Sequence, residues 1–246
     1  MALAILFWLL VWQVASLVIG QELFLPSPLA VLRALFSMVQ EQVFWLSVGN
    51  SLLRIGLGFL LGLAAGVLLA SFSVAFSLVD TLLRPLMLLV RSTPVASFII
   101  LALVWVNSRY LSTFISFLMV LPVIYSGTYA GLRAADKSLL EMAAVFHVGF
   151  WRRMRAIYLP ALRPFLLSSC ELALGMSWKS GVAAEVIGLP VGTIGERLYQ
   201  AKIYLMMPEL FAWTLVIILL SGLFGKLIIQ GLKMAAKNLS GEGAPE

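Results

Sequence analysis

Residues 138–160 read SLLEMAAVFHVGFWRRMRAIYLP, and they separate two long hydrophobic segments of the chain. The first half of this stretch carries one acid, Glu141, and the second half carries three arginines, Arg152, Arg153 and Arg155. A membrane-spanning helix needs roughly 20 mostly apolar residues. The stretch is too polar to insert, so we predict a helical loop that lies at the membrane surface between two spans.

The loop, which we bound at residues 136–160, is predicted to contain two helices. Asp136 can cap the first helix, and Gly149 indicates a turn. A basic helix over residues 150–158 follows, and Pro160 is expected to end it and to start the next span. An ordinary loop retained by positive charge explains the arginines, but it does not explain the two alanines that follow a single acid on an apolar face.

The composition of the whole chain indicates an integral membrane protein. Of its 246 residues, 62% are hydrophobic and only 11% are charged, whereas soluble domains are about half apolar and about a quarter charged. We therefore predict an all-α membrane protein that forms one domain over residues 1–246. The net charge of +6 is explained by basic loops on one side of a membrane, so we expect no nucleic-acid partner. The single cysteine, Cys170, is expected to be a buried thiol.

Six hydrophobic segments are long enough to cross a bilayer. The third is interrupted at Pro94, which removes a backbone hydrogen bond and is expected to kink or break the helix. A polar tail over residues 233–246 follows the last span. The predicted spans cover residues 1–20, 44–72, 79–106, 110–132, 161–184 and 209–232.

Two further features predict how helices pack. Ser27, which is followed by proline, is expected to cap a short amphipathic helix over residues 27–41 that lies at the membrane surface. Gly58, Gly62 and Gly66 are four residues apart. This doubled G-x-x-x-G spacing predicts a face on which another helix approaches closely.

Lysine and arginine are unequally divided between the two sets of loops. The positive-inside rule places the richer set in the cytoplasm, so both termini and the loop at 136–160 are predicted to be cytoplasmic. The richer set comprises Arg84, Arg133, Lys137, Arg152, Arg153, Arg155, Arg163, Lys226, Lys233 and Lys237, and the poorer set comprises Arg33, Arg109, Arg197 and Lys202.

The loop resembles the cytoplasmic EAA loop of bacterial ABC importer permeases. In that pattern Glu-Ala-Ala is followed by three residues, a glycine, nine residues, an isoleucine, one residue and Leu-Pro. Residues 141–143 hold the first three places here, and residues 157–160 fall in register. His147 stands where the pattern has glycine. Histidine tolerates a left-handed backbone better than most residues, and Gly149 is the alternative position for the turn.

Segments along nearly the whole chain, among them NSLLRIGLGFLLGLAAGVLLA and ALGMSWKSGVAAEVIG, resemble permeases of the nitrate, sulfonate and taurine branch of this family. The resemblance implies the type I ABC importer permease fold, with about six transmembrane helices and a cytoplasmic coupling helix, in the bacterial cytoplasmic membrane. It also implies a second permease subunit, expected to be an identical copy, two cytoplasmic ATPases and an external binding protein. The chain has no P-loop pattern, so ATP and magnesium are expected to bind the separate ATPase and no cofactor is expected in this chain.

The loop is expected to couple the permease to the ATPase. Its first helix needs an apolar side and small residues to enter a cleft of the partner, and Glu141 can pair with a basic residue there. The predicted coupling residues are Glu141, Met142, Ala143, Ala144, His147, Gly149, Arg152 and Arg153.

Polar and ionisable residues within the spans are the candidates for the translocation pathway, because charge is costly in lipid. Arg91 and Glu171 lie at similar predicted depth and are expected to pair. Arg54 and Lys179 lie nearer the outer side, where they attract an anion or extend to the interface. The predicted pathway residues are Arg54, Arg91, Glu171, Ser177, Trp178, Lys179 and Glu185; for Trp178 and Lys179 the alternative is an interfacial anchor.

Other function classes remain as rivals of the importer hypothesis. A single histidine and the lack of any metal-ligand spacing leave nothing on which to build hydrolysis or a metal site. The rivals are an ATP-independent channel or carrier, and a membrane scaffold without transport activity. A heterodimer with a related permease is the alternative to the homodimer. The family branch handles small anions and also neutral or heterocyclic vitamin precursors, and Lys179 and Arg54 favour an anion.

Overall fold

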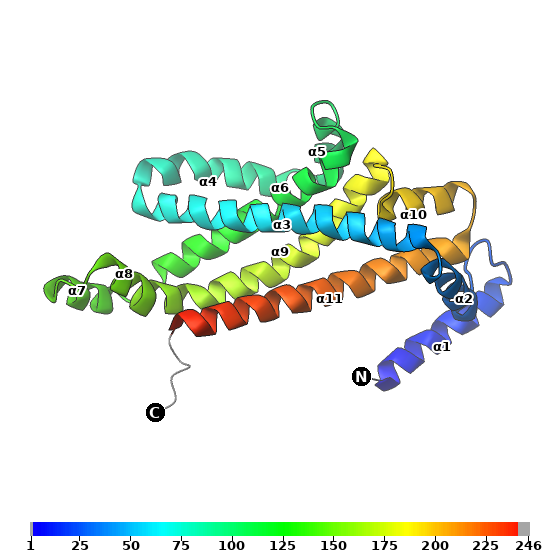
Figure 1. Ribbon diagram of the computed structural model, residues 1–246, viewed down its shortest axis with the longest axis horizontal. Helices are drawn as coiled ribbons and strands as arrows, with labels where there is room; N and C mark the ends of the chain where they lie inside the picture. Colours follow the sequence, from blue (N-terminus) through cyan, green and yellow to red (C-terminus); the bar gives the residue numbers. More distant parts are fainter. Residues whose placement is uncertain (1, 241–246) are drawn as a thin grey trace.

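The computed structural model describes residues 2–240, and the side chains of residues 3–234. This part of the chain is helical and contains no strand. Long helices lie side by side, with α7 and α8 at one end and α2 and α10 at the other (Figure 1); we call these the α7 end and the α10 end. The helices are α1 (Ala2–Ile19), α2 (Pro28–Val39), α3 (Gln42–Ala75), α4 (Ser77–Ser92), α5 (Val95–Ala102), α6 (Ser108–Arg133), α7 (Lys137–Val145), α8 (Phe150–Arg153), the π-helical turn η1 (Met154–Tyr158), α9 (Leu159–Gly188), α10 (Ile194–Ile203) and α11 (Met207–Ser240).

Four helices are long and apolar enough to cross a membrane, namely α3, α6, the helix Phe150–Gly188 and the helix Met207–Met234. Helices α4 and α5 make a fifth span only if the two are taken together, with a bend of 102° between them. Helix α1 is apolar but shorter, so a span over residues 1–20 stays a prediction, and Met1 lies outside the described residues. Helix α11 continues to Ser240; the rest of the predicted tail, residues 241–246, also lies outside them.

The break between α4 and α5 falls at Thr93 and Pro94, so the predicted interruption of the third span is confirmed. Thr93 has φ −78° and ψ 134°, the extended conformation that a residue before proline prefers. The chain turns by 102° at this point. The segment therefore forms two separate helices and not one kinked span.

The prediction that Pro160 ends the basic helix is wrong. Helices α8, η1 and α9 form one continuous helix, Phe150–Gly188. The N–H of Leu159 bonds to the carbonyl of Met154, five residues back, so the hydrogen-bond ladder has already shifted by one residue when it reaches the proline. A π turn of this kind allows a helix to continue past a residue that cannot donate a backbone hydrogen bond, such as Pro160.

Glycines set the distance between α3 and α6. A Cβ atom on Gly62 would lie 2.7 Å from the Cβ of Val120, and one on Gly66 would lie 2.8 Å from the Cβ of Ile124. Gly58 lies one turn earlier on the same face, against α6. No side chain fits in so small a gap, so α3 packs on α6 through its bare backbone.

Glycines also allow the close contact between α6 and α9, which was not predicted from the sequence. A Cβ atom on Gly127 would clash with Ser169, and one on Gly131 would lie 2.9 Å from the side chain of Leu162. Helix α6 is therefore held closely by α3 on one side and by α9 on another.

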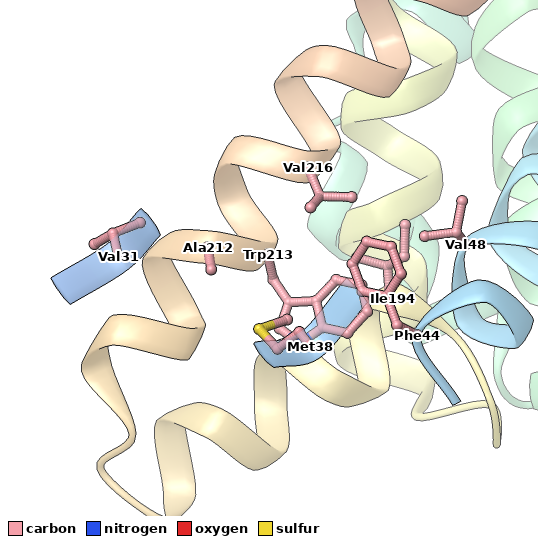
Figure 2. Packing of buried hydrophobic residues seen from close by; sticks show 8 residues of the cluster. All are labelled: Val31, Met38, Phe44, Val48, Ile194, Ala212, Trp213 and Val216. Carbon is pink, nitrogen blue, oxygen red and sulfur yellow. The ribbon is translucent and has the colours of Figure 1, made fainter. Parts of the chain in front are cut away.

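A hydrophobic cluster joins α2, α3, α10 and α11 at the α10 end (Figure 2). The rings of Phe44 and Trp213 stack at its centre, with centroids 5.1 Å apart. Ser27 caps α2, because its Oγ accepts a hydrogen bond from the N–H of Ala30 at 3.2 Å. The other face of α2 is exposed: Phe36 keeps 72% of its surface accessible. An apolar outer face of this kind suits a helix that lies in the membrane interface.

Candidate functional site

Asp136 forms the N-cap of α7. Its Oδ1 accepts hydrogen bonds from the Oγ of Ser138 at 2.6 Å and from the N–H of Ser138 at 2.9 Å. These bonds lower the pKa of the Asp136 carboxyl below its usual range. The carboxylate is therefore charged at neutral pH. Its negative charge also interacts favourably with the positive end of the helix dipole.

His147 closes the other end of α7. Its φ is +49°, in the left-handed region where glycine is the usual residue. The N–H of Val148 donates to the carbonyl of Ala143 at 2.9 Å, and the N–H of His147 donates to that of Ala144 at 3.1 Å. This pair of bonds is the Schellman motif. Gly149 has an ordinary φ of −62°, so the turn is made by His147, not by Gly149.

A hollow of about 570 Å³ lies between α7 and the helix that begins with α8. Its α7 side is apolar and its other side is basic. The hollow brings together four of the predicted coupling residues, Met142, Ala143, Arg152 and Arg153, with Leu139, Phe146, Val148, Arg155, Ala156 and Ile157. Glu141, Ala144 and His147 are exposed outside it.

Large apolar side chains are exposed around this hollow. Val145 is 74% exposed, Phe146 is 73% exposed and Trp151 is 81% exposed. Apolar groups left open at the end of a helical bundle, beside a ring of basic residues, indicate a contact with another protein. We call residues 141–153 the coupling surface, and Figure 1 shows that the helices carrying it project beyond the long helices.

The ion pair predicted between Arg91 and Glu171 is absent from the described residues. Arg91 instead lines a pocket of about 170 Å³ with Asp80, Arg84 and Tyr129, and the hydroxyl of Tyr129 donates to Asp80 at 3.0 Å. The reason is the packing of α4, which contacts α3 and α6 rather than α9.

Trp178 and Ser177 lie inside the helical bundle. Trp178 is 1% exposed, and its ring meets that of Phe224 edge-on, with centroids 5.9 Å apart. The carbonyl of Ser177 accepts a hydrogen bond from Ser116 at 3.1 Å. Within this chain both residues join α9 to its neighbours, and neither lines an open surface.

Glu171 and Lys179 lie on one exposed face of α9. They are eight residues apart, with Gly175 between them, so the three share a side of the helix. A Cβ atom on Gly175 would meet nothing within 4 Å, and Leu172, beside them, is 65% exposed. Two charges on the outside of a membrane-spanning helix are too costly for lipid. This face therefore requires water or another protein subunit.

Glu185 is completely buried and connects three helices. Its Oε2 accepts hydrogen bonds from Ser51 Oγ at 2.7 Å and from the N–H of Gly195 at 3.2 Å. Ser51 Oγ in turn accepts from the N–H of Ile194 at 2.9 Å. The carboxylate thus anchors the start of α10 to α3 and α9. Ser51 was not predicted as a site residue, because its partner Glu185 lies 134 residues away in the sequence.

Arg54 interacts electrostatically with the buried Glu185 and lines a pocket at the α10 end that it shares with Arg109. The predicted pathway residues therefore do not form one cluster within a single chain. They divide into an exposed face of α9, a buried core around Trp178 and Glu185, and two pockets at different levels of the bundle.

Comparison with known proteins agrees with this architecture. Residues 58–235 match the family described as the binding-protein-dependent transport system inner membrane component. The chain is 28% identical to a probable ABC transporter permease protein of Brucella melitensis, over 84% of this chain and 83% of the relative. It is 25% identical to a putative aliphatic sulfonates transport permease protein of Bacillus subtilis, over 93% and 82%. It is also 25% identical to a nitrate import permease protein of Synechocystis, over 79% and 72%.

Proposed function

Because the chain belongs to the binding-protein-dependent transport system inner membrane components, we propose a specific way in which it works. The chain is a multi-pass inner-membrane permease subunit of an ABC importer, and it is not an enzyme. An ATPase and a binding protein are its general partners. Our proposal concerns the coupling surface, the second permease subunit and the orientation in the membrane.

The coupling surface, in our proposal, docks into the ATPase. Its exposed apolar side chains, among them Phe146 and Trp151, fill a cleft of the partner, and Glu141 pairs with a basic residue there. The α7 end is then cytoplasmic, which agrees with the arginines at 152, 153 and 155. The unbroken helix Phe150–Gly188 supports this mechanism most directly, because it joins the coupling surface to a membrane span without a flexible linker.

The exposed face of α9 is proposed to meet a second copy of this chain. Glu171 and Lys179 need protein or water around them, and a pathway between two permease subunits supplies both. Closure of the ATPases on nucleotide moves α7 and, through the continuous helix, α9. The pathway between the two copies then opens alternately to the two sides of the membrane.

Phe146→Asp tests the coupling proposal. The residue is 73% exposed, so the substitution leaves the fold of this chain intact. We expect it to remove an apolar contact at the centre of the interface, where truncations cost about 2 kcal/mol or more. The affinity of the permease for the ATPase should fall by about thirtyfold, and titration of the ATPase onto the immobilised, tagged permease measures it.

Tyr204→Asp is the matched control, because Tyr204 is an aromatic residue of 72% exposure at the α10 end. This variant should retain the ATPase at the level of the unmodified chain. Equal retention of the ATPase by both variants would show that it does not bind at the coupling surface.

A further inference from the structure

We propose that the pocket at the α10 end, formed by α3, the start of α6 and the turn after α9, binds the oxyanion group of the transported solute. This proposal rests on the proposed function, because the bound solute is transported only if the chain is a permease subunit. The ligand class is a small organic anion, with a sulfonate or similar group at one end and an apolar part at the other.

The pocket has a volume of about 490 Å³, within the range of roughly 300–1,000 Å³ that is usual for small-molecule sites. Its polar lining consists of two arginines, Arg54 and Arg109, two asparagines, Asn50 and Asn107, and a serine. None of the described lining residues is acidic. The wall is thus made of hydrogen-bond donors and positive charge, which is the chemistry that recognises an oxyanion.

Arg54 supplies the clearest sign of a missing ligand. Its Nη1 atom is buried, and it has no hydrogen-bond partner among the described residues. A buried guanidinium N–H without an acceptor is costly, so an acceptor brought by a ligand would be strongly favoured. No described residue accepts a hydrogen bond from Arg54 Nη1, although Glu185 Oε1 is also buried and without a partner.

Glu185 interacts electrostatically with Arg54, but its hydrogen bonds are made to other groups. Its Oε2 is engaged by Ser51 and Gly195, and it forms no hydrogen bond with Arg54. The lining of the pocket contains two guanidinium groups and, among the described residues, no acid, so the lining itself is positively charged. A guanidinium binds the oxygens of an oxyanion in pairs, which gives both strength and orientation.

Two neighbouring contacts position the rim of this pocket. Asn50 Nδ2 donates to the carbonyl of Gly192 at 2.9 Å and so holds the turn that follows α9. The guanidinium of Arg109 lies over the ring of Tyr110, with its carbon 6.0 Å from the centroid, and the side chain is exposed. Arg109 is therefore exposed at the rim and accessible to a solute that arrives from outside.

The third wall of the pocket is apolar. Leu189, Pro190 and Val191 line it, and Val191 is 82% exposed. Leu189 is held toward the pocket by a left-handed backbone with φ +47°, which is unusual for a branched side chain. An inorganic ion has no apolar part that could contact this wall, whereas the carbon chain of an organic anion would pack against it.

Isothermal titration calorimetry with ethanesulfonate tests the proposal on the full-length permease in phosphatidylcholine nanodiscs. We expect saturable binding with one site per chain. Arg54→Gln and Arg109→Gln should each weaken it by about tenfold or more, because each removes a charge-assisted hydrogen bond. Arg33→Gln, which removes an exposed arginine of α2 outside the pocket, should leave the affinity unchanged.

The absence of saturable binding, or the same affinity in all three variants, would overturn the assignment. Arg109 is exposed, so its variant reports on binding even if Arg54→Gln alters the fold. Competition by phosphatidylglycerol added to the nanodiscs would assign the pocket to a lipid headgroup and would also overturn the proposal. The assay uses neither ATP nor a partner, so a permease that binds its ATPase but not ethanesulfonate refutes this site alone. A permease that binds ethanesulfonate but no ATPase refutes the coupling instead.

Discussion

His147 shows how much a single residue decides at the coupling surface. A left-handed backbone costs an ordinary L-residue roughly 1–2 kcal/mol, and the resembling loops have glycine at this place. The sequence left His147 and Gly149 as alternatives for the turn. The hydrogen bonds decide between them: the N–H of His147 donates to the carbonyl of Ala144, and the N–H of Val148 donates to the carbonyl of Ala143.

Substitution of His147 therefore has a predictable sign. His147→Gly should stabilise the end of α7 by about 1 kcal/mol and slow hydrogen exchange at the Val148 amide, whereas His147→Val should speed it by at least about tenfold. Hydrogen exchange followed by mass spectrometry measures both. Gly149→Ala is the control, because Gly149 has an ordinary φ and open space around it. If Gly149→Ala had an effect as large as that of His147→Val, the assignment of the turn to His147 would be refuted.

Glu185 and Trp178 mark the limit of inference from single residues. Charged and aromatic residues within a span signal importance, and the sequence identified both. Their place in the pathway stays a prediction, and the sequence did not show that Glu185 bonds to Ser51 and Gly195 in the interior. The partners of a buried group come from distant parts of the chain, and no local pattern shows them.

Helical elements were predictable where the signal is local. The spacing of Gly58, Gly62 and Gly66 indicated a packing face, and Ser27 and Pro94 indicated a helix start and a break. The same signals could not show that α6 is the partner of that face, nor that α4 and α5 diverge by 102°. Pro160 misled the prediction, because a π turn formed upstream is invisible to residue propensities.

Gly62→Ala and Gly49→Ala should change stability in opposite directions. Both residues lie in α3, where alanine favours the helix by about 1 kcal/mol over glycine. A Cβ atom on Gly49 meets nothing within 4 Å, but one on Gly62 would lie 2.7 Å from the Cβ of Val120. We expect Gly49→Ala to be neutral or stabilising, and Gly62→Ala to be destabilising by about 1–3 kcal/mol. Thermal unfolding in detergent micelles measures this, and a Gly62→Ala variant as stable as Gly49→Ala would refute close α3–α6 packing.

The molecule as a whole leaves two of its surfaces incomplete. One is the coupling surface, with Phe146 and Trp151 open at the α7 end. The other is the face of α9 with Glu171 and Lys179, whose charged side chains are exposed on a membrane-spanning helix. Composition predicted a membrane protein, and the loop pattern predicted an ATPase partner. Neither could predict which helix face is exposed and so available to the proposed second subunit, because that depends on how the span helices pack around α6.

Native mass spectrometry of the gently extracted complex is the most direct test of the central claim. We expect two copies of this chain with two copies of a protein that carries a P-loop, and loss of that protein from the Phe146→Asp complex. A chain that is extracted alone and still moves solute across liposomes without ATP would contradict the account. One copy of this chain beside a related permease would contradict the homodimer.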